Sequence, residues 1–170
     1  LLSIASDARL ITTNTLNLTA PSSGGLAMVQ GSGIWQLAAP GTSVTNPDIF
    51  YSPEGLLGNY EAIVTARIDT GPAGTTRHIR GNSNRNDFYR YYGDWQEQGG
   101  LQGAGDLYFY GAAQGSYEMT FTLAANNSSY TGNVTLQRGD LILYHNQALT
   151  AANDVHLNPA AGENAYLHPW

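Results

Sequence analysis

The stretch Asn126-Asn-Ser-Ser-Tyr-Thr-Gly-Asn-Val-Thr-Leu-Gln-Arg-Gly-Asp-Leu-Ile-Leu, ending at Leu143, decides the expected fold class. Its apolar side chains alternate in two short runs, 134–136 and 141–143, and Gly139 between them predicts a turn. Alternation places the apolar side chains of both runs on one face of a strand. A unit this short cannot bury such a face alone, so it must stack on neighbours with the same pattern.

Neighbours of this kind occur on both sides of the stretch. Alternating apolar runs recur at short intervals, and the longest of them spans 60–68, whereas helical periodicity is nearly absent. The other runs lie at 16–18, 26–28, 34–37, 107–109, 119–123 and 155–157. The chain is therefore expected to be built from strands throughout.

The run Tyr130 to Leu143 resembles the passenger-associated repeat of bacterial autotransporter-like surface proteins. Upstream, Gly103-Ala-Gly-Asp-Leu-Tyr-Phe-Tyr-Gly resembles the strand that commonly precedes such a unit, and Asn146-Gln-Ala-Leu resembles its tail. The chain departs from the repeat at Asn133, where a glycine is usual, and at Asp140, where a threonine is usual. The resemblance covers about a quarter of the chain and implies a repetitive, surface-exposed protein.

The resemblance implies a parallel β-helix, a solenoid-like stack of coils, formed by one all-β domain over residues 1–170. We expect residues 103–157 to match the repeat best, and residues 41–100 to form an irregular, loop-rich excursion rich in aromatic residues and arginine. An antiparallel β-sandwich or jelly roll remains the alternative, because short strands at this spacing suit either architecture.

Composition narrows the class of partner. Charged residues make up only 12% of the chain, and 13 acidic residues against 7 basic ones give a net charge of −6. Nucleic acids and anionic membranes bind clustered basic residues, so neither is an expected partner. The chain has no cysteine, which excludes disulfides and thiolate metal sites, and no apolar run long enough to span a bilayer as a helix. No cofactor is expected.

The segment richest in arginine and aromatic residues predicts a binding surface. Exposed tyrosine and tryptophan rings beside arginine can stack on sugars and hydrogen-bond their hydroxyl groups. The expected partner of this surface is a glycan or a host or cell-surface protein, although the same rings could instead cover the core. The predicted surface residues are Arg77, Arg80, Tyr89, Tyr91 and Trp95.

The same segment supplies an enzymatic alternative, a polysaccharide lyase or hydrolase. It would use Arg77, His78, Arg80, Asp87 and Asp94. No two carboxylates stand close together in the sequence, and the histidines lack the spacing of metal ligands. We therefore expect no catalytic residues, no metal and no enzyme.

A second set of residues is expected to be structural. Asparagine side chains at a turn can hydrogen-bond to the backbone of successive turns in a stack. The predicted structural residues of the repeat are Asn126, Asn127, Tyr130, Gly132, Gly139 and Leu141.

The sequence as a whole predicts a structural or adhesive segment of a secreted bacterial surface protein. Its strands would stack into a rod or self-assembling fibre that presents loops, chiefly 75–98, and joins copies of itself end to end or packs on neighbouring repeats. A pilin-like subunit that donates a terminal strand from residues 1–18 is a third interpretation. The expected location is extracellular, at the bacterial cell surface.

Overall fold

A computed structural model describes residues 1–20, 25–38, 43, 45, 47–53, 60–83, 95–113 and 119–169. Within these ranges the chain is all-β, and every strand pairing is parallel. The strands are β1 (Leu2–Ile4), β2 (Arg9–Thr12), β3 (Leu16–Ala20), β4 (Gly25–Gly31), β5 (Ile34–Leu37), β6 (Ile49–Pro53), β7 (Tyr60–Val64), β8 (Arg67–Asp69), β9 (Thr76–Ser83), β10 (Trp95–Glu97), β11 (Leu101–Gly103), β12 (Asp106–Ala113), β13 (Thr120–Leu123), β14 (Ser129–Tyr130), β15 (Val134–Leu143), β16 (Val155–Leu157) and β17 (Ala165–Pro169).

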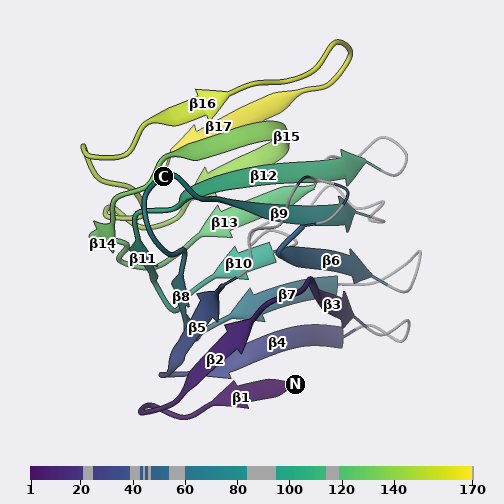
Figure 1. The fold of residues 1–170 in the computed structure, drawn as a ribbon. Coiled ribbons are helices and arrows are strands. Elements are labelled where there is room, and N and C mark those ends of the chain that lie inside the picture. Colours follow the sequence, from purple (N-terminus) through teal and green to yellow (C-terminus); the bar gives the residue numbers. More distant parts are fainter. Residues whose placement is uncertain are drawn as a thin grey trace.

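The strands form two sheets. A 12-stranded sheet has the order β1-β4-β7-β10-β13-β15-β12-β9-β6-β3, with β16 and β17 also paired to β15, and a 5-stranded sheet has the order β14-β11-β8-β5-β2. As far as β14, neighbours in either sheet are mostly three strands apart in the chain, so successive passes lie one above another from β1 at one end to β16 and β17 at the other (Figure 1).

Strand β15 joins the two flanks of the large sheet. Its first part, Val134–Leu136, pairs with β12 and β16, whereas its second part, from Gly139 onward, pairs with β13 and β17. Gly139 has φ +106°, and a Cβ there would lie 2.4 Å from the Met119 carbonyl oxygen. Only glycine fits this bend without strain. We call the β3-β6-β9-β12-β15-β16 flank the second ladder, and the β1-β4-β7-β10-β13-β15-β17 flank the first ladder.

The expected architecture is wrong in three respects. A simple β-helical stack is overturned by the 12-stranded sheet, which runs without interruption through β15 and curves into a half-barrel. The physical reason is that Gly139 bends the strand instead of ending it. An antiparallel sandwich or jelly roll is excluded because the described strands pair only in parallel. The described parts of 41–100 are not an excursion either, because they supply β6, β7, β9 and β10 to the two flanks of the large sheet and β8 to the 5-stranded sheet.

The interior is filled by the inward-facing side chains of each strand. Rings from three strands, β10, β12 and β13, pack together there, with Trp95 and Phe109 centroids 5.8 Å apart and Phe109 and Phe121 centroids 4.9 Å apart. Such pairs contribute on the order of 1 kcal/mol beyond the burial of their area. Aliphatic side chains complete the core above and below the rings, so one continuous apolar column runs between the sheets.

Candidate functional site

The outward side of the second ladder carries a row of aromatic and arginine side chains. Register places Asn17 of β3, Phe50 of β6, Arg80 of β9, Tyr110 of β12 and Arg138 of β15 next to one another. Parallel register keeps equivalent positions of neighbouring strands about 4.8 Å apart, so these five side chains form one ladder across the sheet. We call this row the aromatic–arginine face.

Arg80 lies at the centre of this face between two rings. Its guanidinium carbon is 5.5 Å from the ring centroid of Phe50 and 5.8 Å from that of Tyr110. Both distances fall within the range in which a cation is attracted to the negative face of a ring. The rings on either side therefore fix the orientation of the guanidinium.

A groove of about 380 Å³ opens beside Arg80 at the N-terminal part of the face. We call it the Arg80 groove; its described lining residues are Thr15, Asn17, Thr45, Pro47, Phe50 and Arg80. The floor is held in place by the Thr15 hydroxyl, which donates to the Pro47 carbonyl at 2.6 Å. The groove thus combines an aromatic ring, a cation, an amide and hydroxyl groups.

Further along the face, polar side chains are connected to one another. The Tyr108 hydroxyl donates to Gln137 at 2.6 Å, and the Gln137 amide donates to Glu163 at 3.1 Å. Glu163 also accepts from the Tyr110 hydroxyl at 3.3 Å and lies 3.5 Å from the Arg138 guanidinium. Desolvation by burial, with the charge of Glu163 and with Tyr110, raises the pKa of Tyr108, so its phenol stays protonated and remains a donor.

Among the predicted surface residues that the structure describes, only Arg80 is placed on this face. Arg77 lies in the interior, where its side chain is 3% exposed, its Nε donates to the Thr70 carbonyl at 2.8 Å and its Nη1 is 3.6 Å from Asp48. Trp95 is fully buried in the ring stack. Tyr89 and Tyr91 lie outside the described residues.

Of the residues of the enzymatic alternative that the structure describes, Arg77 is separated from His78 and Arg80. His78 is on the outer side of β9, where its ring is tilted against that of Tyr108 with centroids 5.3 Å apart, while Arg77 points inward on the same strand. Asp87 and Asp94 lie outside the described residues. Within the described ranges, no three His, Asp or Glu side chains are grouped closely enough to hold a metal ion.

Asn127 and Glu97 meet at the corner between the two sheets. Asn127 Oδ1 accepts from the Leu101 backbone at 2.7 Å, and its Nδ2 donates to the Ala148 carbonyl at 3.0 Å, so the amide joins the passes before and after its own. The same Nδ2 donates to Glu97 Oε2 at 3.1 Å, and the Gly100 N–H donates to Glu97 Oε1. Desolvation by burial raises the pKa of Glu97 above its ordinary value of 4.5, although these donors oppose the shift.

The other predicted repeat residues take structural positions. Tyr130 is fully buried, its hydroxyl donates to the Asn133 carbonyl at 2.7 Å, and burial raises its pKa strongly. Asn126 is exposed and accepts from the Ser128 N–H at 3.0 Å. Gly132 packs against the Gly105 backbone, Gly139 forms the bend of β15, and Leu141 is in the core.

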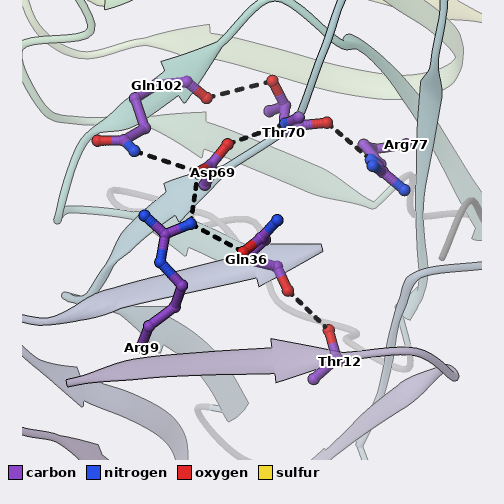
Figure 2. A network of polar contacts seen from close by, with 8 residues as sticks. Arg9, Thr12, Gln36, Asp69, Thr70, Arg77 and Gln102 are labelled. Carbon is purple, nitrogen blue, oxygen red and sulfur yellow. Dashed lines mark hydrogen bonds and ion pairs between the residues drawn. The ribbon is translucent and has the colours of Figure 1, made fainter. Parts of the chain in front are cut away.

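The outer side of the 5-stranded sheet carries a polar network that is already internally satisfied. Arg9 donates to Gln36 at 2.8 Å and to Asp69 at 3.2 Å, and Gln102 donates to the same Asp69 oxygen at 3.2 Å (Figure 2). The second Asp69 oxygen accepts from the Gly71 N–H at 3.0 Å. Because its members bond to one another, this network ties β2, β5, β8 and β11 together and is a structural feature.

Asn17, Phe50 and Tyr110 are not among the site residues predicted from the sequence. A signal for them existed, because Phe50, Arg80 and Tyr110 recur at equal intervals of the chain and so occupy the same place in successive passes. Only the register between the strands shows that these recurring residues lie side by side.

No helix in the described part of the chain is long and apolar enough to cross a membrane. Comparison with known proteins found no match among family models, curated proteins or solved structures.

Proposed function

We propose that this chain is a structural, non-enzymatic segment of a secreted bacterial surface protein, and that it associates end to end with copies of itself. The single observation that carries the proposal is the exposure of core-type side chains at both ends of the strand stack. The resemblance of 130–143 to a surface-protein repeat and the low charge content support the proposed location.

The N-terminal end of the stack exposes inward-facing leucines. Leu2 pairs with Val29 and Leu16 pairs with Ile49, and both partners are fully buried, so the two leucines occupy core positions. Leu2 is nevertheless 37% exposed, and a groove of about 390 Å³ opens between β1, β3 and β4 beside both leucines. Nothing in the described part of the chain covers this end of the column.

The opposite end has the same character. Leu157 of β16 pairs with the fully buried Leu136, and Leu167 of β17 pairs with the fully buried Leu141. Leu157 is 45% exposed because, among the described strands, none lies above it. Each of these partly exposed leucines withholds burial worth on the order of 1 kcal/mol.

A second copy of this chain is the occupant that fits both ends. Among the described strands, β1 and β3 have a partner on one side only, as do β16 and β17. The first ladder ends in β1 and β17 and the second in β3 and β16, and the strands within each ladder are parallel. Docking the β16–β17 end of one copy on the β1–β3 end of another would extend both ladders in parallel. The chain has no lysine, the residue that commonly protects such edges from pairing.

Sedimentation velocity over a concentration series tests this proposal. We expect the chain to form species larger than a monomer at on the order of 100 μM, since stable docking at this concentration requires only micromolar affinity. Leu157→Lys and Leu2→Lys should each shift the population strongly toward smaller species, because either change places a charge in an interface made of core positions.

Ile11→Lys is the matched control. Ile11 is 54% exposed on the edge strand β2 but lies in the outward row with Gln36 and Asp69, so the lysine should leave assembly nearly unchanged. A chain that sediments as a monomer throughout the series, or assembly that survives both leucine substitutions, would overturn the proposal.

A further inference from the structure

We propose that copies of this chain join in the register of the second ladder, with Leu157 of one copy opposite Leu16 of the next, and that Asp154 extends a side-chain hydrogen-bond ladder across the junction. This register rests on the proposed end-to-end assembly and specifies which residues of the two copies lie opposite one another. In it, the Asp154 carboxylate accepts the backbone N–H of Thr13 of the next copy.

A ladder of side-chain hydrogen bonds runs along the corner that precedes the second ladder, and we call it the corner ladder. Asp106 Oδ1 accepts the backbone N–H of Asn133 at 2.8 Å, and Asn133 Oδ1 accepts the backbone N–H of Asp154 at 3.0 Å. These three residues occupy equivalent positions, because they directly precede residues that the register of β12, β15 and β16 places side by side. Each side chain thus bonds to the equivalent residue of the following pass.

Asp154 is the last member of the corner ladder. It is exposed, and its carboxylate has no hydrogen-bond partner among the residues that the structure describes. A following pass would supply the missing donor, as Asn133 and Asp154 themselves do for the residues before them. Among the described strands none follows β16 in the second ladder, so in an end-to-end assembly the next copy supplies this donor.

The register of the second ladder identifies the donor. The core position of Leu16 in β3 recurs in every strand of this ladder, as Ile49, Ile79, Phe109, Leu136 and Leu157. A further pass in the same order places Leu16 of the next copy opposite Leu157. Thr13 then lies opposite Asp154, because both precede the core position by the same number of residues. Thr13 is exposed, and its N–H donates to no group in the described part of the chain.

The backbone groups at the two open edges fit this register. In a parallel pair, alternate residues of a strand bond to the neighbours on its two sides. The Leu16 N–H donates to β6 at 3.0 Å, so the Asn17 N–H is directed to the open edge of β3. The Asn158 N–H donates to β15 at 2.9 Å, so the Leu157 carbonyl is directed to the open edge of β16. With Leu157 opposite Leu16, the Asn17 N–H can donate to the Leu157 carbonyl.

The first ladder is less suited to define the register. Its continuation places Leu2 of the next copy opposite Pro169. Proline has no N–H to donate, and prolines at strand edges limit edge pairing. The second ladder and the corner ladder are therefore the part of the junction that decides how two copies align.

Cysteine cross-linking tests the register, because the chain contains no cysteine of its own. Asn17 and Asn158 are both exposed and lie opposite one another in the proposed junction, within the range of roughly 4.4–6.8 Å over which a disulfide joins two Cα atoms. Within one copy they are separated by the whole second ladder, roughly 24 Å, so the disulfide can form only between copies. Under mild oxidation, an equimolar mixture of Asn17→Cys and Asn158→Cys chains should give a covalent dimer.

Thr19→Cys mixed with Asn158→Cys is the matched control. Thr19 is exposed on the same side of β3 as Asn17. In the proposed register its Cα is about 8 Å from that of Asn158, beyond the reach of a disulfide, so we expect cross-linking at least about tenfold slower than for the Asn17 pair.

Asp154→Ala and Asp154→Asn, each introduced into the Asn158→Cys chain, test the corner ladder in the same assay. Alanine removes the acceptor, whereas asparagine keeps one, as Asn133 does at the equivalent position. We expect Asp154→Ala to slow the cross-linking with Asn17→Cys by about fivefold or more and Asp154→Asn to stay within about twofold of the parent pair, since one hydrogen bond is lost only in the first.

Cross-linking as fast with Thr19→Cys as with Asn17→Cys would overturn the register. Equal rates for Asp154→Ala and Asp154→Asn would overturn the role of Asp154. Both results leave end-to-end assembly standing if the parent chain still sediments as species larger than a monomer. A parent chain that stays monomeric, with no cross-linking of the Asn17 pair, would overturn the register and the assembly together.

Discussion

At the scale of single residues, Arg77 and Arg80 show how strand alternation separates side chains that are close in sequence. Their positions differ by an odd number, so on one strand they must point to opposite sides. Arg77 points inward to Asp48, and Arg80 points outward between two rings. The opposite orientation was predictable from parity alone. The partner of Arg77 was not, because pairing with Asp48 depends on the register between β6 and β9.

The buried ion pair between Arg77 and Asp48 predicts that substituting Arg77 destabilises the fold far more than substituting Arg80. Arg77→Met should lower the free energy of unfolding by about 3–5 kcal/mol, because Asp48 is left charged and unpaired in the interior. Arg80→Gln should lower it by about 1 kcal/mol or less. Urea denaturation measures both values.

The double variant Arg77→Met with Asp48→Asn checks the cause. The amide introduced by Asp48→Asn would carry no charge. It would keep an acceptor for the backbone N–H of His78, which donates to the Asp48 carboxylate at 2.8 Å. Part of the lost stability should return. A double variant less stable than Arg77→Met alone would show that the ion pair is not the source of the effect.

At the scale of elements, the strands were easier to predict than the corners between them. The pattern of residues 60–68 predicts one strand, because Ala62, Val64, Ala66 and Ile68 alternate without a break and all four are buried. The structure instead divides the run into β7 and β8, which belong to different sheets. Inward-facing residues continue to alternate with outward-facing ones around such a corner. The alternation of apolar residues therefore does not show where one strand ends and the next begins. At Gly139 the opposite happened, and a predicted turn proved to be a bend within β15.

The corner between β10 and β11 predicts a pH dependence of stability. Burial raises the pKa of Glu97 in the folded chain above 4.5, so the folded state holds this proton more tightly than the unfolded state. The contribution of Glu97 is therefore complete below about pH 4.5 and is lost as the pH rises toward the folded-state pKa.

Glu97→Gln removes this titration. The free energy of unfolding of the Glu97→Gln variant, minus that of the parent chain, should increase with pH from about 4.5 upward, by at most about 1.4 kcal/mol per pH unit. Urea denaturation of both chains at several pH values gives the difference. A difference that stays flat, or falls, over this window would contradict the assignment of a raised pKa to Glu97.

At the scale of the whole molecule, alternation and turn composition indicated strands throughout, but not how the strands join into sheets. The 12-stranded sheet is continuous because β15 pairs with strands of both flanks. This double pairing depends on the direction of the strand after Gly139, which cannot be predicted from a local sequence pattern. The aromatic–arginine face has the same origin, because its members Phe50, Arg80 and Tyr110 meet only through register. Long-range pairing therefore decides both the architecture and the groove.

A mixture of two end-blocked variants gives the sharpest test of end-to-end assembly. Leu2→Lys blocks one end of the stack and Leu157→Lys blocks the other, so a mixture retains one compatible pair of ends. Because the contact joins two different surfaces, sedimentation velocity of the equimolar mixture should show a dimer and nothing larger, while each variant alone stays monomeric. A mixture that remains monomeric, or variants that assemble alone as readily as the parent chain, would contradict the account.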